Sequence, residues 1–113
     1  MVDHVDDKPP SPWQPTTDKL ELAVLGKLLE ELGELSSIVA RCIIQGWDAD
    51  EPITGKPNKQ ALCEEIADVR ANIEHVINHL QLDTWFIKNR KDKKYNYVAK
   101  WHNMLEEIRK AGS

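Results

Sequence analysis

Apolar residues recur at a helical spacing along two stretches of the chain, residues 19–45 and 59–80, and this periodicity most limits the possible folds. At about 100° per residue, each stretch gathers its apolar side chains into one arc of a helix. The first arc holds Leu20, Val24, Leu25, Leu28, Leu32, Leu35, Ile38, Val39, Cys42 and Ile43. The second arc holds Leu62, Cys63, Ile66, Val69, Ile73, Val76, Ile77 and Leu80. Because each arc needs an apolar partner, we predict two long helices that pack together.

Local signals indicate where these helices begin and end. Asp18 followed by Glu21 has the spacing of a capping box, so the first helix should begin at Lys19 and run to Gln45, with Gly46 placed to end it. Residues 46–58 are rich in turn-forming and acidic residues and are expected to form the connecting loop, with Pro52, Gly55 and Pro57 among them.

A third helix is predicted after Asp83, which can cap a helix that begins at Thr84. The helical period continues to near Lys110, and the sequence leaves open whether the helix breaks around Asp92. No stretch alternates between apolar and polar residues as a strand does. We therefore predict an all-α fold, a helical bundle with two long antiparallel helices plus a C-terminal helical segment, completed by oligomerisation.

The length of 113 residues suits one hydrophobic core. Residues 1–17 carry four prolines and no helical period, so we expect an extended N-terminal arm, followed by a single all-α domain over residues 18–113. No apolar run reaches the roughly 20 residues of a membrane span, and the N-terminus lacks the pattern of a secretory signal. We therefore expect a cytoplasmic protein with no membrane partner.

Two acidic pairs interrupt the apolar periodicity. Glu31 and Glu34 lie in the first predicted helix, and Glu65 and Asp68 lie in the second. Residues three apart on a helix are neighbours, so each pair directs two carboxylates to one side. Glu31 falls inside the apolar arc, where an unpaired carboxylate is costly.

Two explanations for these carboxylates are open. They can pair with nearby cations such as Lys27, Arg41 or Arg70, or the two pairs can face each other and bind a metal ion. Because every donor in the set is a carboxylate oxygen, the metal explanation favours Mg²⁺, with Mn²⁺ as the next choice, and not zinc. We favour the metal explanation because both helices carry a pair.

Three further residues are candidates for binding an anionic or aromatic ligand. Lys91 and Lys94 belong to a basic run over residues 88–94, which can be a solvated helix face or a site for phosphate groups. Trp47 can stack on a nucleotide base or pack against the protein. The net charge of −4 disfavours nucleic-acid binding by the chain as a whole, so no specific nucleic-acid binding is expected.

The segments Lys27–Leu35 and Glu64–Asn72 together resemble the MazG-like all-α nucleoside triphosphate pyrophosphohydrolases, a superfamily that includes dimeric dUTPases and phosphoribosyl-ATP pyrophosphohydrolases. The family pattern is ExxE, a connecting stretch and then ExxD, and the match covers about residues 19–80. The thirty residues between Glu34 and Glu65 are somewhat long for this pattern.

The resemblance implies a helical oligomer, a homodimer or dimer of dimers, that cleaves a nucleoside triphosphate between its α- and β-phosphates. It implies that Mg²⁺ is held by the four acids and that the nucleotide is contacted by a residue one turn beyond the second pair; these residues are Glu31, Glu34, Glu65, Asp68 and Asn72. Two alternatives remain, a non-catalytic all-helical oligomeric interaction module and a related enzyme acting on a phosphoribosyl nucleotide.

Overall fold

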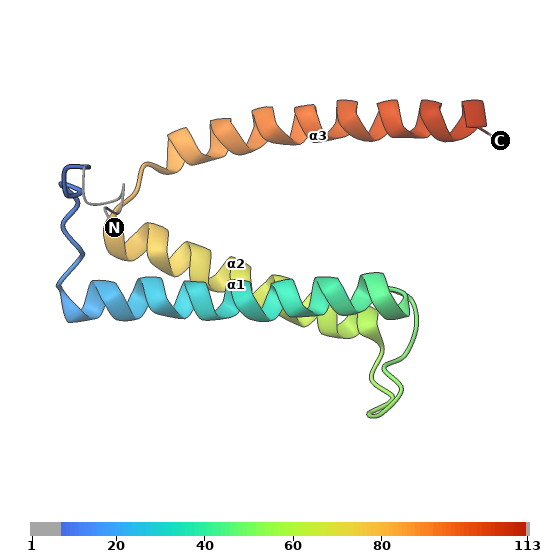
Figure 1. The fold of residues 1–113 in the computed structure, drawn as a ribbon, viewed down its shortest axis with the longest axis horizontal. Helices are drawn as coiled ribbons and strands as arrows, with labels where there is room; N and C mark the ends of the chain where they lie inside the picture. Colours follow the sequence, from blue (N-terminus) through green and yellow to red (C-terminus); the bar gives the residue numbers. More distant parts are fainter. Residues whose placement is uncertain (1–7, 113) are drawn as a thin grey trace, which may run out of the picture. The chain divides into compact units, whose positions relative to one another are not determined.

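The structure, a computed structural model, describes residues 8–112 and contains three α-helices and no strand in that range. In chain order the helices are α1 (Lys19–Gln45), α2 (Asn58–Leu80) and α3 (Thr84–Gly112) (Figure 1). The all-α prediction is confirmed. The chain divides into two compact units whose boundary falls inside α2, between Asn72 and Ile73.

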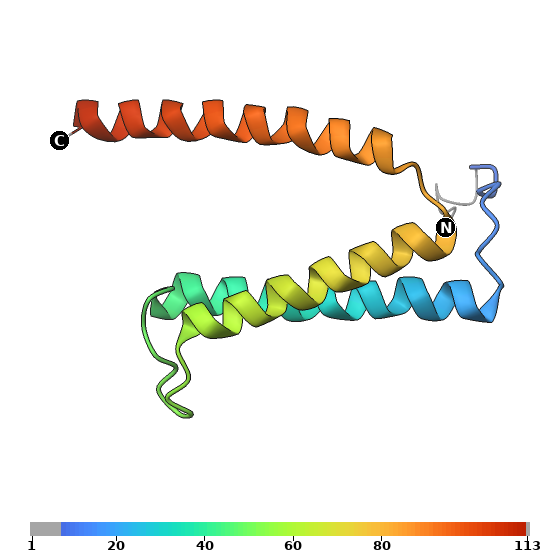
Figure 2. The ribbon, with the colours of Figure 1, turned by 180° about the vertical axis from the view of Figure 1, so that it is seen from behind.

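The first unit contains α1 and the first part of α2, residues 58–72, which run antiparallel and side by side (Figures 1 and 2). The α1 boundaries agree with the prediction. Asp18 Oδ1 accepts hydrogen bonds from the backbone N–H groups of Leu20 and Glu21, at 3.0 and 2.9 Å, and so caps the helix. Gly46 ends α1 with a φ of 101°, which a residue with a side chain rarely adopts.

The N-terminal arm has no regular structure over residues 8–18. Its one large apolar side chain, Trp13, is exposed. The first seven residues of the predicted arm, and Ser113 at the end of the predicted domain, lie outside the described residues.

The core between α1 and α2 is narrow, and it differs from the predicted apolar arcs. Val24, Ala61 and Val69 are buried. On α1, a large part of the predicted arc is exposed, including Leu20, Leu25, Leu32, Val39 and Ile43. On α2, Ile66, Ile73 and Cys63 are also exposed, which corrects the expectation that they lie in the core. The reason is that each arc is wider than the contact one neighbouring helix can make.

Residues 46–57 form an ordered loop around two buried polar side chains. The Glu51 carboxylate accepts hydrogen bonds from the Thr54 N–H at 2.7 Å, the Thr54 hydroxyl at 2.9 Å and the Ile53 N–H at 3.1 Å, and these bonds, led by those from Thr54, lower the pKa of Glu51. Asn58, which is fully buried, donates from Nδ2 to Gln45 Oε1 and to the Gly46 carbonyl, at 3.1 and 3.0 Å. Asn58 thereby joins the end of α1 to the start of α2.

The second unit contains the end of α2 and the whole of α3. Gln81, with a φ of 53°, ends α2 in the left-handed conformation, and the Leu82 N–H bonds to the Ile77 carbonyl at 3.0 Å, as in a Schellman motif. Asp83 Oδ1 accepts from the Phe86 N–H at 2.9 Å, which confirms the predicted cap. α3 continues without a break through Asp92, and none of its described residues is buried.

No helix of the described residues is both long enough and apolar enough to cross a bilayer.

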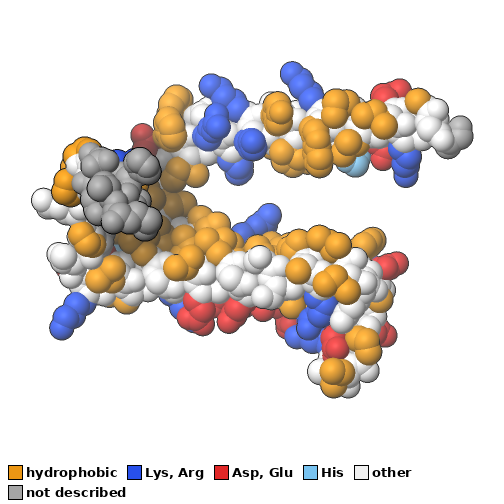
Figure 3. All heavy atoms as spheres, viewed as in Figure 1, with side chains coloured by type: hydrophobic (Ala, Val, Ile, Leu, Met, Phe, Trp, Pro, Cys, Tyr) orange, Lys and Arg blue, Asp and Glu red, His pale blue; other side chains and the backbone are white. Residues whose placement is uncertain are grey.

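Charged side chains are unevenly distributed along α3. Basic side chains gather over its first half, hydrophobic side chains follow in the second half, and acidic side chains line one edge of the α1–α2 pair (Figure 3).

Asn58→Ala is expected to lower the free energy of unfolding by about 1–3 kcal/mol, because it removes the two hydrogen bonds that this fully buried side chain donates to the Gly46 carbonyl and to Gln45 Oε1. Urea denaturation followed by circular dichroism measures this change. Asn78→Ala, the same substitution at an exposed position of α2, serves as the control and should cause no loss. An equal effect in both variants would contradict the role of Asn58.

Candidate metal centre

Three of the predicted acids converge in the first unit. Glu31 of α1 and Glu65 and Asp68 of α2 each offer one carboxylate oxygen, and these oxygens lie within 4.8 Å of one another. The convergence follows from two features of the chain. The i, i+3 spacing puts Glu65 and Asp68 on neighbouring positions of α2, and the antiparallel packing brings Glu31 opposite them.

Glu31 is the most buried member, with 7% of its surface exposed, whereas Glu65 is half-buried and Asp68 is exposed. Two of the carboxylate oxygens, Glu31 Oε2 and Glu65 Oε2, are buried and have no hydrogen-bond partner in the described chain. An uncompensated buried carboxylate is among the costliest groups a fold can hold. A positive partner would lower this cost, and no group within residues 8–112 donates a hydrogen bond to either oxygen.

The ion-pair explanation accounts for only part of the cluster. Lys27 Nζ lies 3.4 Å from Glu31 Oε1 and 3.3 Å from Glu30 Oε1, and these interactions, led by the hydrogen bond to Glu30, raise the pKa of Lys27. Neither Arg41 nor Arg70 forms an ion pair within the described range. Lys27 thus forms an ion pair with one oxygen of Glu31, as the ion-pair explanation predicted. The i, i+3 and i, i+4 spacings from Lys27 to Glu30 and Glu31 are those of neighbouring residues on a helix.

The geometry of the three oxygens fits a divalent cation. Oxygens bound to one Mg²⁺ at about 2.1 Å lie roughly 3 to 4.2 Å apart, so the observed spread needs only small side-chain rotations to close. All three donors are hard oxygens, which excludes a preference for thiolate-seeking or imidazole-seeking metals. Asp68 is exposed, so this side of the cluster is accessible to solvent.

Glu34, the fourth predicted acid, is exposed and lies outside the group of three. Its electrostatic environment still ties it to the cluster. The pKa of Glu34 is raised above its ordinary value, mainly by the negative charge of Glu31, with further contributions from desolvation and from the charge of Glu65. The sequence predicted four metal-binding carboxylates; in the structure three of them converge and Glu34 lies beside them.

Asn72 lies one turn beyond Asp68 and is half-buried. Its Nδ2 donates to the Asp68 carbonyl at 2.9 Å, and its side-chain oxygen forms no hydrogen bond in the described chain.

Trp47, the predicted stacking residue, does not lie near the acid cluster. It follows the end of α1, roughly 20 Å along the helix axis from Glu31, and the Lys59 ammonium lies over its ring at 4.8 Å.

Lys91 and Lys94 belong to α3 in the second unit. Lys91 Nζ lies 3.8 Å from Asp92 Oδ1, and Lys94 Nζ lies 5.2 Å from the centre of the Tyr97 ring. Both side chains are exposed. Their predicted role with phosphate groups stays a prediction.

No family model, curated protein or solved structure matches this chain. The resemblance to the MazG-like superfamily thus depends on the two acidic motifs alone, and the function has to be inferred from the geometry of the acids.

The raised pKa of Glu34 predicts how stability depends on pH. A carboxylate whose pKa is raised by folding destabilises the fold when it is charged, and this penalty disappears as the pH falls through its folded pKa towards 4.5. In EDTA at neutral pH, Glu34→Gln should therefore unfold at a higher urea concentration than the wild type, and the difference should vanish near pH 4.

The matched control is Glu74→Gln at an exposed position of α2. It should leave the urea midpoint unchanged at both pH values. A midpoint for Glu34→Gln at or below that of the wild type at neutral pH would contradict the crowding of negative charge around Glu34.

Proposed function

We propose that this protein is a Mg²⁺-dependent nucleoside triphosphate pyrophosphohydrolase, which converts a nucleoside or deoxynucleoside triphosphate and water to the monophosphate and pyrophosphate. The observation that carries the proposal is the pair of buried carboxylate oxygens without a partner, in a group of three carboxylates drawn from the two predicted motifs. The resemblance to the MazG-like enzymes supplies the reaction, and the acids supply a physical basis for it.

In this proposal Glu31, Glu65 and Asp68 hold the cation, and Glu34 lies beside them. When bound, Mg²⁺ supplies charge stabilisation to the phosphate oxygens. Burial of Glu31 fixes the position of its carboxylate, because a packed side chain has few rotamers open to it. The exposed carboxylates leave room for the substrate.

Other residues of the chain have supporting roles in the proposal. The side-chain oxygen of Asn72 can accept a hydrogen bond from the nucleotide, and Lys91 and Lys94 would neutralise phosphate oxygens that the cation does not reach. The general base is Glu34 or Glu30, and of the two, Glu30 already pairs with Lys27. We place the enzyme in the cytoplasm, in keeping with the sequence.

Glu31→Gln and Asp68→Asn should each lower turnover about a hundredfold or more, because each removes one negative charge from the cation site. The helical content should remain that of the wild type. The measurement is pyrophosphate release from a panel of nucleoside and deoxynucleoside triphosphates, with and without Mg²⁺. Glu64→Gln, next to Glu65 but outside the group of three, is the control.

Turnover within about threefold of the wild type in both site variants would overturn the proposed site.

Mg²⁺ binding provides a readout that does not depend on activity. Millimolar Mg²⁺ should raise the melting temperature of the wild type but not of Glu31→Gln, because a ligand that binds only the folded state stabilises it. Replacing Mg²⁺ by Ca²⁺ or Mn²⁺ in the same assay compares cation preference.

The non-catalytic interaction module is the second candidate. The observation in its favour is the large number of exposed apolar side chains on the helices. Such a module would show no pyrophosphate release with any substrate and no stabilisation by Mg²⁺.

Self-association is part of the proposed function, because the uncovered apolar face of α1 needs a partner. Leu25, Leu29 and Leu32 lie beside the packed face of α1 and are each more than a third exposed. We expect a homodimer or dimer of dimers whose unfolding midpoint rises with protein concentration. Sedimentation equilibrium measures the mass directly, and a monomer at every concentration would contradict the expectation.

A further inference from the structure

α3 carries a basic and aromatic surface from which the proposed active site uses only Lys94. Of the residues in α3, eight are basic and three are acidic, although the whole chain has a net charge of −4. Basic residues are thus concentrated in α3, and this helix is positively charged although the whole chain is acidic. We define the α3 surface as Phe86, Arg90, Lys93, Lys94, Tyr97 and Trp101.

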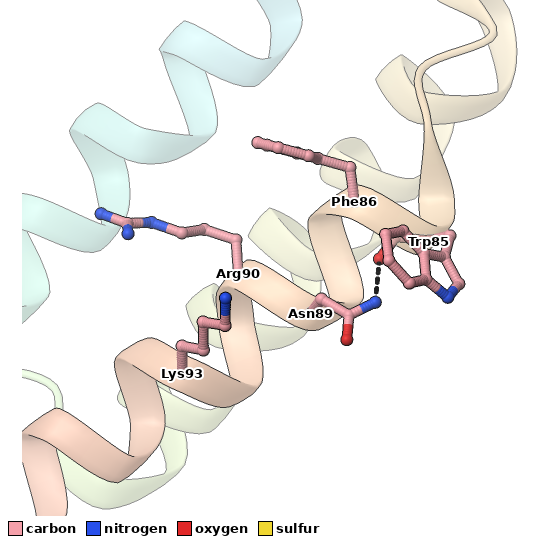
Figure 4. A pocket seen from close by; sticks show the side chains of 5 residues that line it. All are labelled: Trp85, Phe86, Asn89, Arg90 and Lys93. Atoms are coloured by element: carbon pink, nitrogen blue, oxygen red, sulfur yellow. Dashed lines mark hydrogen bonds between the residues drawn. The ribbon is translucent and has the colours of Figure 1, made fainter.

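These residues share one side of the helix. Successive members are three or four residues apart, except for the adjacent Lys93 and Lys94, and at about 100° per residue they fall within one arc of roughly 100°. Figure 4 shows Phe86 and Arg90 extending from the same side of α3, with Lys93 near Arg90, whereas Trp85 extends elsewhere. Two hollows of about 300 and 320 Å³ lie on this helix, and both are lined by Arg90 and Lys93.

The cations of the α3 surface lack acidic partners. Within residues 8–112, none of Arg90, Lys93 and Lys94 forms an ion pair. Further along the same helix, by contrast, Arg109 pairs with Glu106 at 2.6 Å. Three adjacent cations on one face, without a carboxylate between them, repel one another and favour an anionic ligand that bridges them.

The aromatic rings indicate which kind of anion. Phe86, Tyr97 and Trp101 are each more than half exposed, so their ring faces are accessible. Aromatic rings interleaved with cations form the surface that proteins use for single strands, since bases stack on the rings while phosphates meet the cations. From Phe86 to Trp101 the helix spans about 22 Å, enough for several nucleotides of an extended strand.

Two other partners fit less well. A membrane-surface helix keeps its cations on the face opposite its apolar residues, but Arg90 and Lys94 lie among the aromatic residues on the same face. Duplex DNA or RNA hides its base faces, so it would use the cations and leave the exposed rings without contacts. A single strand uses both components of the surface.

We propose that the α3 surface binds single-stranded nucleic acid without sequence preference. The α3 surface belongs to the second unit and the acid cluster to the first, and the inference does not depend on the proposed pyrophosphohydrolase activity. Two kinds of contact contribute to binding. Salt weakens the attraction between the cations and the phosphates, but it affects the stacking of bases on the rings little.

The test uses the full chain and a fluorescein-labelled oligo(dT) of about twelve nucleotides, titrated by fluorescence anisotropy between roughly 50 and 200 mM NaCl. Arg90→Gln/Lys93→Gln should weaken binding at least about tenfold at the lower salt concentration and reduce the salt slope by about 1.4. Lys88→Gln/Lys110→Gln removes the same charge from the opposite side of α3 and should weaken binding less than about threefold.

A second pair of variants tests stacking. Phe86→Leu/Tyr97→Leu keeps apolar side chains but removes two rings, and it should weaken binding at least about fivefold at both salt concentrations. Tyr95→Leu, an exposed tyrosine on the other side of α3, is its control and should bind as the wild type does. Circular dichroism checks that every variant keeps its helical content.

Glu31→Gln should bind the oligonucleotide normally, which separates this inference from the function of the acids. Three results would each overturn the inference: no binding at the lower salt concentration, binding of a duplex of equal length as tight as that of the single strand, or equal losses in the surface variants and their controls. Binding to vesicles of anionic phospholipid without binding to oligo(dT) would also overturn it and would identify a membrane surface as the partner.

Discussion

The burial of the Glu31 carboxylate against α2 is the constraint on which the candidate site depends. A charge in that position is tolerated only when other groups compensate it, and Lys27 compensates one of its two oxygens. The remaining oxygen has no hydrogen-bond partner in the described chain, and neither has one oxygen of Glu65, a carboxylate of the same cluster. Two like charges at close range destabilise a fold unless a cation joins them. In the proposed function, a divalent ion bound between these carboxylates would relieve that cost.

The loop between α1 and α2 provides the rigidity that such a site needs. The Asn58 amide ties the start of α2 to the end of α1, and the Glu51 carboxylate closes the turn that precedes it. Because these hydrogen bonds join the two ends of the loop, they restrict how far α2 can slide along α1. That register decides which carboxylates of α1 lie opposite those of α2.

The two compact units have contrasting surfaces. The first unit gathers acidic side chains along one edge, and the first half of α3 in the second unit gathers basic ones (Figure 3). Phe86, Tyr97 and Trp101 share one side of α3 with some of these cations. An acidic cluster suits a cation, and a basic aromatic face suits a polyanion with exposed rings. Net charge alone would have excluded the second of these, because averaging over the chain cancels local concentrations of charge.

The sequence by itself determined both ends of α1 and the start of α3, because caps at Asp18 and Asp83 and the positive φ at Gly46 are local effects that need no distant contact. It left open whether the third helix breaks around Asp92, where α3 is continuous. It also placed the acids on the correct helices. Only the tertiary structure decided that Glu31 converges with Glu65 and Asp68 while Glu34 remains exposed beside them. The periodicity also predicted that Ile66 lies in the core, whereas Ile66 is exposed in the structure. Periodicity defines an arc around each helix axis, but which part of a wide arc is covered depends on the rotation of the neighbouring helix, and that rotation is set by packing between residues far apart in the chain.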